Sequence, residues 1–243
     1  MNTQSVWKDK LVVDSFLNQK RASIPNAADH LNTMLHILRY NERPVKKFVD
    51  LGAGDGILSQ LILEQFDESL GYAVDFSKPM IEAATKKLAN YSTRMKIVEA
   101  DISSSNWQQS IFVDGLEKVD AIVSGYCIHH LSHGRKFELY QEIYNRLENG
   151  GLFINIEHVA SKSDWGERLS DEAFIDAIIA HEKPDGNPKS REQTAADFQN
   201  RPDKKDNILL SVDVQCEWLR LIGFQGVDVF FKSFELAVFC GRK

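Results

Sequence analysis

The sequence predicts a doubly wound α/β fold, in which a seven-stranded, mostly parallel sheet has its last strand antiparallel, helices on both faces and an N-terminal helical cap. From residue 46 onward, short β-rich runs alternate with helical periods, as in KKFVDLG, ILSQLILEQF and GYAVDF. This alternation predicts parallel neighbours, because parallel strands need crossover connections. Near the C-terminus, only a tight turn separates GVDVFFKS from FELAVFCGRK. Such a turn joins antiparallel strands.

Each element follows from its apolar periodicity and its capping residues. Strands are predicted at KKFVDLG, GYAVDF, MKIVEAD, VDAIVSGY, LFINIEHV and the terminal pair. Helices are predicted at ILSQLILEQF, at KPMIEAATKKLAN with Ser77 as N-cap, around 105–113, near 166–181 and at VDVQCEWLRLIGF. A further helix, FELYQEIYNRLENGG, is expected to end on a glycine C-cap before the fifth strand.

We expect a helical cap at residues 1–45 and one domain at 46–243 that carries a lid-like insertion at 161–207. The cap contains an amphipathic helix at about 26–40. Within the insertion, residues 181–207 contain three prolines, many charges and almost no apolar side chains. This composition predicts a long surface loop with room for one helical turn.

The composition is typical of a soluble globular protein, since 43% of the 243 residues are hydrophobic and 26% are charged. No window approaches the roughly 20 apolar residues of a membrane span, and MNTQSVWKDK lacks the apolar core of a signal peptide. We therefore expect a cytoplasmic protein without a membrane span. The net charge of -6 disfavours a nucleic-acid surface. The three cysteines are expected as buried thiols. The oligomeric state stays open, with a homodimer as one option.

The loop after the first predicted strand, within VDLGAGDGIL, carries the main functional signal. In an open parallel sheet, ligands bind beyond the carboxyl ends of the strands, which is where this loop lies. Gly52, Gly54 and Gly56 have the spacing G-x-G-x-G, whereas the dinucleotide fingerprint G-x-G-x-x-G would need glycine in place of Ile57. Asp50, just before the loop, suits a cationic ligand and opposes a pyrophosphate. A nicotinamide cofactor is therefore disfavoured.

Two further acids end the next two strands. Asp75 ends YAVDF, 25 residues after Asp50, near the roughly 20-residue spacing at which an acid accepts hydrogen bonds from ribose hydroxyls. Asp101 follows the third strand, where it can meet the edge of an adenine. Capping of a strand end or a helix is the alternative for Asp50 and Asp75. The predicted ligand is an adenosine with a cationic, amine-bearing tail, and S-adenosyl-L-methionine fits that description.

With these motifs the sequence resembles the class I S-adenosylmethionine-dependent methyltransferases. The stretches that carry the resemblance are FVDLGAGDGILSQLIL, YAVDFSKPMIEAA, IVEADI, DAIVSGYCIHHL, LENGGLFINIEHV and the FFKSFELAVF hairpin. The resemblance covers about residues 46–243. It implies the fold described above and an enzyme that transfers a methyl group from S-adenosyl-L-methionine to an acceptor.

The resemblance also implies cofactor-binding roles for residues at the ends of the first four strands. These residues are Asp50, Gly52, Gly54, Gly56, Asp75, Phe76, Met80, Asp101, Ile102 and Ser124. By the resemblance, the glycines border the methionine part, Asp50 faces the ammonium group and Asp75 takes the ribose diol. Phe76 and Met80 lie against the adenine, although Met80 fits core packing equally well. Asp101 and its neighbour reach the adenine edge, and Ser124 begins the segment under the methionine carboxylate and the methyl group.

Methyl transfer from a sulfonium is an in-line displacement, so the protein must align the acceptor and keep water out. An acidic acceptor also needs a base near the methyl group. Candidates follow strands four and five, namely Tyr126, His129, His130, Glu157 and His158, of which Tyr126, His129 and His158 are selected as catalytic. A structural role is the alternative for the histidines. His129 and His133 have the spacing of a metal pair, but no nearby carboxylate completes a set, so no metal is predicted.

We expect a small-molecule acceptor. Ser124-Gly125-Tyr126-Cys127 stands where enzymes that methylate nucleobase amines carry Asn or Asp, two prolines and an aromatic residue, and it lacks the aspartate of the magnesium-dependent catechol enzymes. The substrate pocket is expected between the cap (Trp7, Phe16 and Arg21), the strand-four loop and the insertion.

Three alternative functions stay open. The first is a transferase that adds a carboxymethyl or methyl group to the wobble uridine of tRNA. The basic residues of 181–207 do not support it as a clear stripe, because acidic residues accompany them. The second is a non-catalytic module that binds S-adenosylmethionine. The third is an NAD-dependent oxidoreductase, which would need the missing fingerprint.

Overall fold

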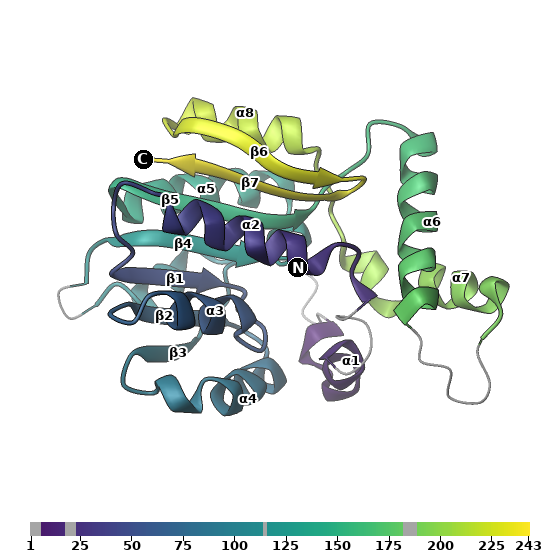
Figure 1. Cartoon of the computed structure of the whole chain (residues 1–243), viewed down its shortest axis with the longest axis horizontal. Coiled ribbons are helices and arrows are strands. Elements are labelled where there is room, and N and C mark those ends of the chain that lie inside the picture. Colours follow the sequence, from purple (N-terminus) through teal and green to yellow (C-terminus); the bar gives the residue numbers. More distant parts are fainter. Residues whose placement is uncertain (1–5, 18–22, 114–115, 182–188) are drawn as a thin grey trace.

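Seven strands form one mixed sheet in the order β3-β2-β1-β4-β5-β7-β6 (Figure 1). The computed structural model describes residues 6–17, 23–113, 116–181 and 189–243. The strands are β1 (Lys47–Leu51), β2 (Leu70–Asp75), β3 (Met95–Glu99), β4 (Val119–Gly125), β5 (Leu147–His158), β6 (Gln225–Ser233) and β7 (Leu236–Arg242). Strands β1 to β5 pair in parallel, and β7 is antiparallel to both β5 and β6. The predicted fold class is confirmed.

Helices cover both faces of this sheet. On one face lie α2 (Ala27–Arg39), α3 (Ile57–Gln65) and α4 (Lys78–Lys87), and on the other lie η5 (Ser105–Ser110), α5 (His133–Arg146) and α8 (Val212–Ile222). Successive strand residues point to opposite faces, so Phe48 of β1 joins the first core and Val49 joins the second. The sheet is therefore buried between two apolar layers.

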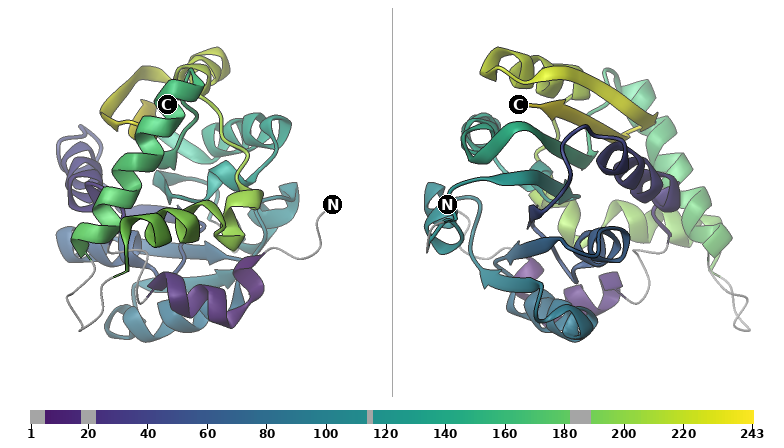
Figure 2. Two further views of the ribbon diagram at one scale, coloured as in Figure 1. Left: turned by 90° about the vertical axis from the view of Figure 1, so that its right-hand side faces the viewer. Right: turned by 60° about the vertical axis from the view of Figure 1, so that its left-hand side comes forward.

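A third group of elements lies beyond the carboxyl ends of the parallel strands (Figures 1 and 2). It consists of η1 (Val6–Lys8), α1 (Lys10–Ser15), η6 (Ile128–His130), α6 (Asp164–His181), α7 (Arg191–Gln199) and η7 (Pro202–Asp206). The rings of Phe174 and Phe198 stack at 5.5 Å between centroids and join α6 to α7. These elements surround the edge at which the glycine loop lies. The predicted boundary between cap and domain stays a prediction, and α2 packs Met34 and Leu38 into the core.

The described part of 181–207 is more ordered than the predicted surface loop. Residues 191–199 form helix α7, whose N-cap Ser190 accepts a hydrogen bond from the Gln193 N–H. Thr194 and Phe198 are buried. The predicted loop was wrong here because Phe198 and polar side chains such as Arg191 attach the helix to α6. Several basic residues of the segment pair with acids, for example Lys189 with Asp197.

Two other local predictions were wrong at their boundaries. The segment around 105–113 forms the short 3-10 helix η5, since serines at 103–105 favour capping over helix formation. Helix α5 ends at Arg146, and β5 begins directly at the buried Leu147, so there is no glycine C-cap. Gly150 instead lies inside β5, where its N–H donates to the Lys243 carbonyl. The N-cap of α4 is Ser77, as predicted.

Candidate active site

Three glycines shape the loop between β1 and α3, and each has a left-handed backbone. The φ angles of Gly52, Gly54 and Gly56 are 65°, 55° and 81°, a region that favours glycine. A Cβ on Gly52 would lie 2.0 Å from Cys127 Sγ, and one on Gly56 would lie 2.7 Å from the leucine that follows α4. A Cβ on Gly54 would meet only Met80 Sδ, at 3.8 Å. Packing thus requires glycine at the outer two positions, while open space remains above Gly54.

Asp50 lies fully buried next to this loop, with one carboxylate oxygen unpaired. Its Oδ2 accepts hydrogen bonds from the Ser59 N–H at 3.1 Å and from the Ser59 hydroxyl at 2.8 Å. Its Oδ1 has no partner in the described part of the chain. Burial raises the pKa of Asp50 to about 7, although the Ser59 hydrogen bonds oppose the shift. Because an unpaired buried oxygen is costly, a cationic N–H group in the cavity would be bound favourably here.

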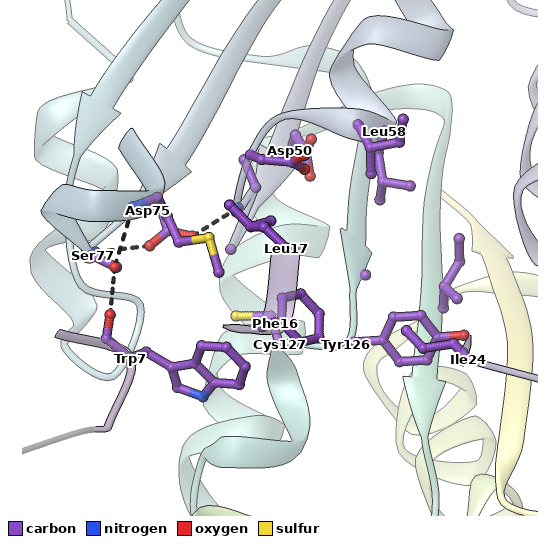
Figure 3. A pocket seen from close by; sticks show the side chains of 18 of the residues that line it. Trp7, Phe16, Leu17, Ile24, Asp50, Leu58, Asp75, Ser77, Tyr126 and Cys127 are labelled. Atoms are coloured by element: carbon purple, nitrogen blue, oxygen red, sulfur yellow. Dashed lines mark hydrogen bonds between the residues drawn. The ribbon is translucent and has the colours of Figure 1, made fainter. Parts of the chain in front are cut away.

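Asp75 joins the glycine loop to the start of α4. Its Oδ2 accepts from the Gly54 N–H at 2.9 Å, and its Oδ1 accepts from the Ser77 N–H at 2.8 Å. The Ser77 hydroxyl in turn donates to the Trp7 carbonyl at 2.5 Å (Figure 3). Burial raises the pKa of Asp75 above its usual value. This chain of contacts holds the loop, α4 and the N-terminal segment together around one cavity, which Phe76 also lines.

Four of the predicted cofactor residues lie outside the described cavity lining, namely Gly56, Asp101, Ile102 and Ser124. Asp101 is exposed, and its Oδ1 accepts from the Ser103 N–H at 2.8 Å. Ile102 is buried in the core. The Ser124 hydroxyl donates to the Leu51 carbonyl at 2.9 Å and so links β4 to β1. Their contacts with the adenine and the methionine part stay predictions.

The far wall of the cavity comes from the N-terminal segment and α2. The lining residues from these elements are Trp7, Phe16, Leu17, Ile24, Ala27, His30 and Leu31. Trp7 and Phe16 thus lie where the sequence predicts them, whereas Arg21 lies outside the described residues. No described residue of 161–207 lines the cavity, so the expected contribution of the insertion is not found in that part of the chain. The cavity volume is about 140 Å³, below the roughly 300–1,000 Å³ of typical ligand pockets.

Tyr126, just after β4, pairs with His30 of α2 in the lining of the cavity. Its backbone φ is 53°, which is rare for a residue with a side chain. Its hydroxyl lies 2.6 Å from His30 Nδ1. His30 is only 1% exposed, and its Nε2 has no partner among the described residues. Burial lowers the pKa of His30 to about 4 despite the nearby Asp29, so the imidazole is neutral.

The other two predicted catalytic histidines lie behind the cavity rather than in its lining. His129 Nδ1 lies 2.6 Å from Glu157 Oε1, and burial lowers the pKa of this histidine while raising that of Glu157 to about 7. His158 Nε2 lies 3.1 Å from Glu235 Oε2. Among the three predicted catalytic residues, only Tyr126 faces the cavity. The catalytic roles of both histidines stay predictions.

His130 lines the cavity, but both of its ring nitrogens have partners. The Trp7 indole N–H donates to Nε2 at 3.2 Å, and Nδ1 lies 3.1 Å from the Asp206 carbonyl. An indole can only donate and a carbonyl can only accept, so Nδ1 carries the proton. Burial lowers the pKa of His130 to about 3. His130 is therefore a neutral residue that holds the N-terminal segment against η7.

His30 and most of the apolar lining residues were not predicted from the sequence. His30 precedes Leu31 in the predicted amphipathic helix, and its place as a polar residue on the apolar face of that helix could have indicated a functional role. Its pairing with Tyr126 joins residues 96 positions apart, which no local pattern reveals.

Within the described residues, no three or more His, Cys, Asp or Glu side chains are grouped so that they could hold a metal ion. In the same part of the chain, no helix has the length and apolar character needed to cross a membrane.

The donor set of this site fits S-adenosyl-L-methionine. Asp50 Oδ1 is an unpaired buried acceptor that suits an ammonium group, and the space above Gly54 admits a ligand against the loop backbone. Asp75 presents a carboxylate at the end of β2 within the same cavity, where it can accept hydrogen bonds from a ribose diol.

Residues 48–151 match a family model described as a methyltransferase domain. The carboxy-S-adenosyl-L-methionine synthase of Helicobacter hepaticus is 22% identical, over 97% of this chain and 93% of its own length. That of Shewanella frigidimarina is 26% identical, over 94% and 89%. The structure of human N-acetylserotonin methyltransferase in complex with SAM superposes with a TM-score of 0.60 at 13% identity, over 98% of this chain and 57% of that one. This structural likeness concerns the fold.

Proposed function

We propose that the chain is a class I S-adenosylmethionine-dependent methyltransferase, as the match of residues 48–151 to a methyltransferase domain supports, and that it methylates a small, largely apolar acceptor bound between the glycine loop and the N-terminal segment. When bound, the cofactor supplies an electrophilic methyl group on a sulfonium. The residues of the chain hold that cofactor, align the acceptor and keep water out.

The observation that carries this proposal is the lining of the cavity. Asp50, Asp75 and the glycine loop contribute polar groups, and the N-terminal segment and α2 contribute mainly aromatic and aliphatic side chains. No lysine or arginine is among the described lining residues. The two lining histidines, His30 and His130, are neutral because burial lowers the pKa of each. An uncharged apolar molecule fits such a wall better than an anion does.

In this proposal each residue has a defined task. Asp50 binds the ammonium group of the cofactor, and Asp75 binds the ribose diol. Tyr126 contacts the acceptor, and Trp7 with His130 closes the cavity and excludes water. His129 supports this arrangement from behind through its contact with Glu157.

The test is formation of S-adenosylhomocysteine by purified protein with S-adenosylmethionine and a panel of small ring phenols, amines and ketones. Product with at least one acceptor, lost in Asp75→Ala, supports the proposal. Tight cofactor binding without product from any acceptor would instead indicate a non-catalytic module. Binding of NADH in place of the cofactor would indicate an oxidoreductase.

A second candidate is formation of carboxy-S-adenosyl-L-methionine. The observation that favours it is alignment of almost the whole chain with synthases of that name. Against it, a carboxylate on the cofactor would find no cationic side chain among the described lining residues. Mass spectrometry of the nucleoside released from freshly purified protein separates the two candidates. A cofactor heavier by one carboxyl group would favour the synthase, whereas S-adenosylmethionine or S-adenosylhomocysteine would favour the methyltransferase.

A further inference from the structure

Two buried side-chain atoms in the cavity lining lack a hydrogen-bond partner among the described residues, and they point to two different ligands. They are Asp50 Oδ1 and His30 Nε2. The proposed function assigns a ligand to the first, the ammonium group of the cofactor. It assigns none to the second, which comes from α2 and lies among the apolar side chains of the cavity lining.

The contact with Tyr126 determines which nitrogen of His30 carries the proton. If the Tyr126 hydroxyl donates to Nδ1, one buried group is left unpaired, the N–H at Nε2. If Nδ1–H donates to the phenol oxygen instead, two groups are left, the phenol hydrogen and the Nε2 lone pair. The described residues offer the Tyr126 hydroxyl no second partner. Each unpaired buried group is costly, so the arrangement with fewer of them is favoured and Nε2 is a donor.

The surroundings of His30 define what this donor can bind. The Phe231 ring lies 4.8 Å from the imidazole, edge to face, and Leu31 and Ile24 line the same cavity. A buried neutral N–H in an apolar wall is satisfied by an oxygen that accepts a hydrogen bond. Aromatic walls also favour flat ring systems.

We propose that His30 Nε2–H, oriented by Tyr126, anchors an oxygen atom of the methyl acceptor, and that the acceptor is an uncharged, apolar ring compound with a carbonyl oxygen. This inference rests on the proposed function, which it deepens by naming the substrate class. His30 binds the acceptor, and Tyr126 both lines the site and sets the tautomer of His30.

The first test is the tautomer itself. In protein labelled with ¹⁵N at histidine, the long-range ¹H–¹⁵N spectrum is expected to show His30 protonated at Nε2. In Tyr126→Phe the hydrogen bond to Nδ1 is gone, and the Nδ1 signal should move. Protonation at Nδ1 in the unaltered protein would overturn the inference, and this reading does not depend on any bound cofactor.

The second test uses matched probes on protein saturated with S-adenosylhomocysteine. The probes are indanone, tetralone and naphthoquinone, each paired with its oxygen-free counterpart, indane, tetralin or naphthalene. At least one oxygen-bearing probe should shift the His30 Nε2 signal, and its hydrocarbon should not. No shift from any of them, or equal shifts from both members of each pair, would overturn the inference.

Variants test the contribution of the single donor. His30→Phe should weaken binding of the responsive probe about tenfold, as expected for one hydrogen bond. The affinity for its hydrocarbon counterpart should change by no more than about twofold. His30→Gln, which offers an amide N–H, should recover part of the loss. His36→Phe is the matched control on the exposed face of α2 and should change neither. Equal losses for ketone and hydrocarbon in His30→Phe would mean that His30 only packs.

Calorimetry with S-adenosylhomocysteine on the same samples separates this inference from the proposed function. Failure to bind it would count against the methyltransferase site, while the His30 tautomer would still be readable. Normal binding of S-adenosylhomocysteine together with a His30 signal that no probe shifts would refute only the proposed contact between His30 and the acceptor.

Discussion

The indole N–H of Trp7 donates a hydrogen bond to His130 Nε2 at 3.2 Å, across 123 residues of sequence. This contact joins the N-terminal segment to the end of the strand-four loop. Because Trp7 and His130 both line the cavity, we expect this bond to hold the N-terminal segment against the cavity.

Loss of this bond should loosen the closed state. In Trp7→Phe the ring remains but the donor is lost, which removes about 0.5–1.5 kcal/mol. S-adenosylhomocysteine should therefore dissociate roughly two- to tenfold faster in stopped-flow measurements. Trp165→Phe, at a position 67% exposed on α6, is the matched control. Identical dissociation rates in both variants would show that the contact does not control ligand release.

The three loop glycines should respond differently to the same substitution. Gly52→Ala places a methyl group 2.0 Å from Cys127 Sγ, and the resulting overpacking should lower the free energy of unfolding by about 1–3 kcal/mol or more. Gly54→Ala has no such clash, so mainly the cost of its positive φ, of order 1 kcal/mol, should appear in stability. Urea denaturation measures both values. The larger effect of Gly54→Ala should be on cofactor binding, and retained affinity in that variant would remove the proposed ligand contact.

Asp50 should make stability depend on pH in the unliganded protein. Its pKa of about 7 in the folded state exceeds the value of about 4 expected after unfolding. The folded state therefore keeps a proton that the unfolded state has lost, and stability falls as the pH rises from about 4 through about 7. In Asp50→Asn this loss should be smaller, since Glu157, whose pKa burial also raises to about 7, remains. Denaturation at about pH 5 and about pH 8 checks the sign, and parallel curves for both proteins would contradict it.

The same carboxyl group should make cofactor affinity rise over that range. A bound ammonium group favours ionised Asp50, so calorimetry should find about tenfold tighter binding of S-adenosylhomocysteine at about pH 8 than at about pH 6. Asp50→Asn should bind more weakly and with little pH dependence. A pH-independent affinity in the unaltered protein would argue that the ammonium group binds elsewhere.

Removal of the Asp75 carboxylate should weaken cofactor binding through two effects. Asp75→Ala loses the proposed ribose contacts and the hydrogen bond that orders the Gly54 N–H. Charge-assisted hydrogen bonds contribute about 1.5–3 kcal/mol, so affinity should fall by roughly 10- to 150-fold. Asp67→Asn, an exposed acid after α3, is the control. An unchanged dissociation constant in Asp75→Ala would refute both contacts.

Substitution of His129 should lower the stability of the protein more than it changes the pH dependence of the reaction rate. His129→Leu removes the closest partner of Glu157 Oε1, which keeps the His158 N–H at 2.9 Å, and a hydrogen bond to a charged group contributes about 1.5–3 kcal/mol. Thermal or urea denaturation should report a loss of that size. The pH dependence of turnover should stay the same. If a limb of the pH–rate profile disappears in this variant, His129 is the base that the sequence predicts.

Local sequence patterns were sufficient to predict the sheet, its antiparallel last strand and most helices. Alternation, capping residues and glycine spacing act within a few residues, so they can be read directly from the chain. The predictions were wrong where contacts with residues distant in sequence determine the local structure. Helix α7 forms because Phe198 stacks on Phe174, and β5 starts at Leu147 because that side chain is buried against the sheet.

The sequence alone determined the positions of Asp50, the three glycines and Asp75 at the strand ends, because strand ends and glycine turns can be read from local residues. Only the tertiary structure decided which histidines line the cavity. His30 contacts Tyr126 because α2 packs against the sheet. His129 instead contacts Glu157 and does not line the cavity. Those pairings depend on packing between layers, and the free energy that selects them comes from burial of side chains that are far apart in sequence.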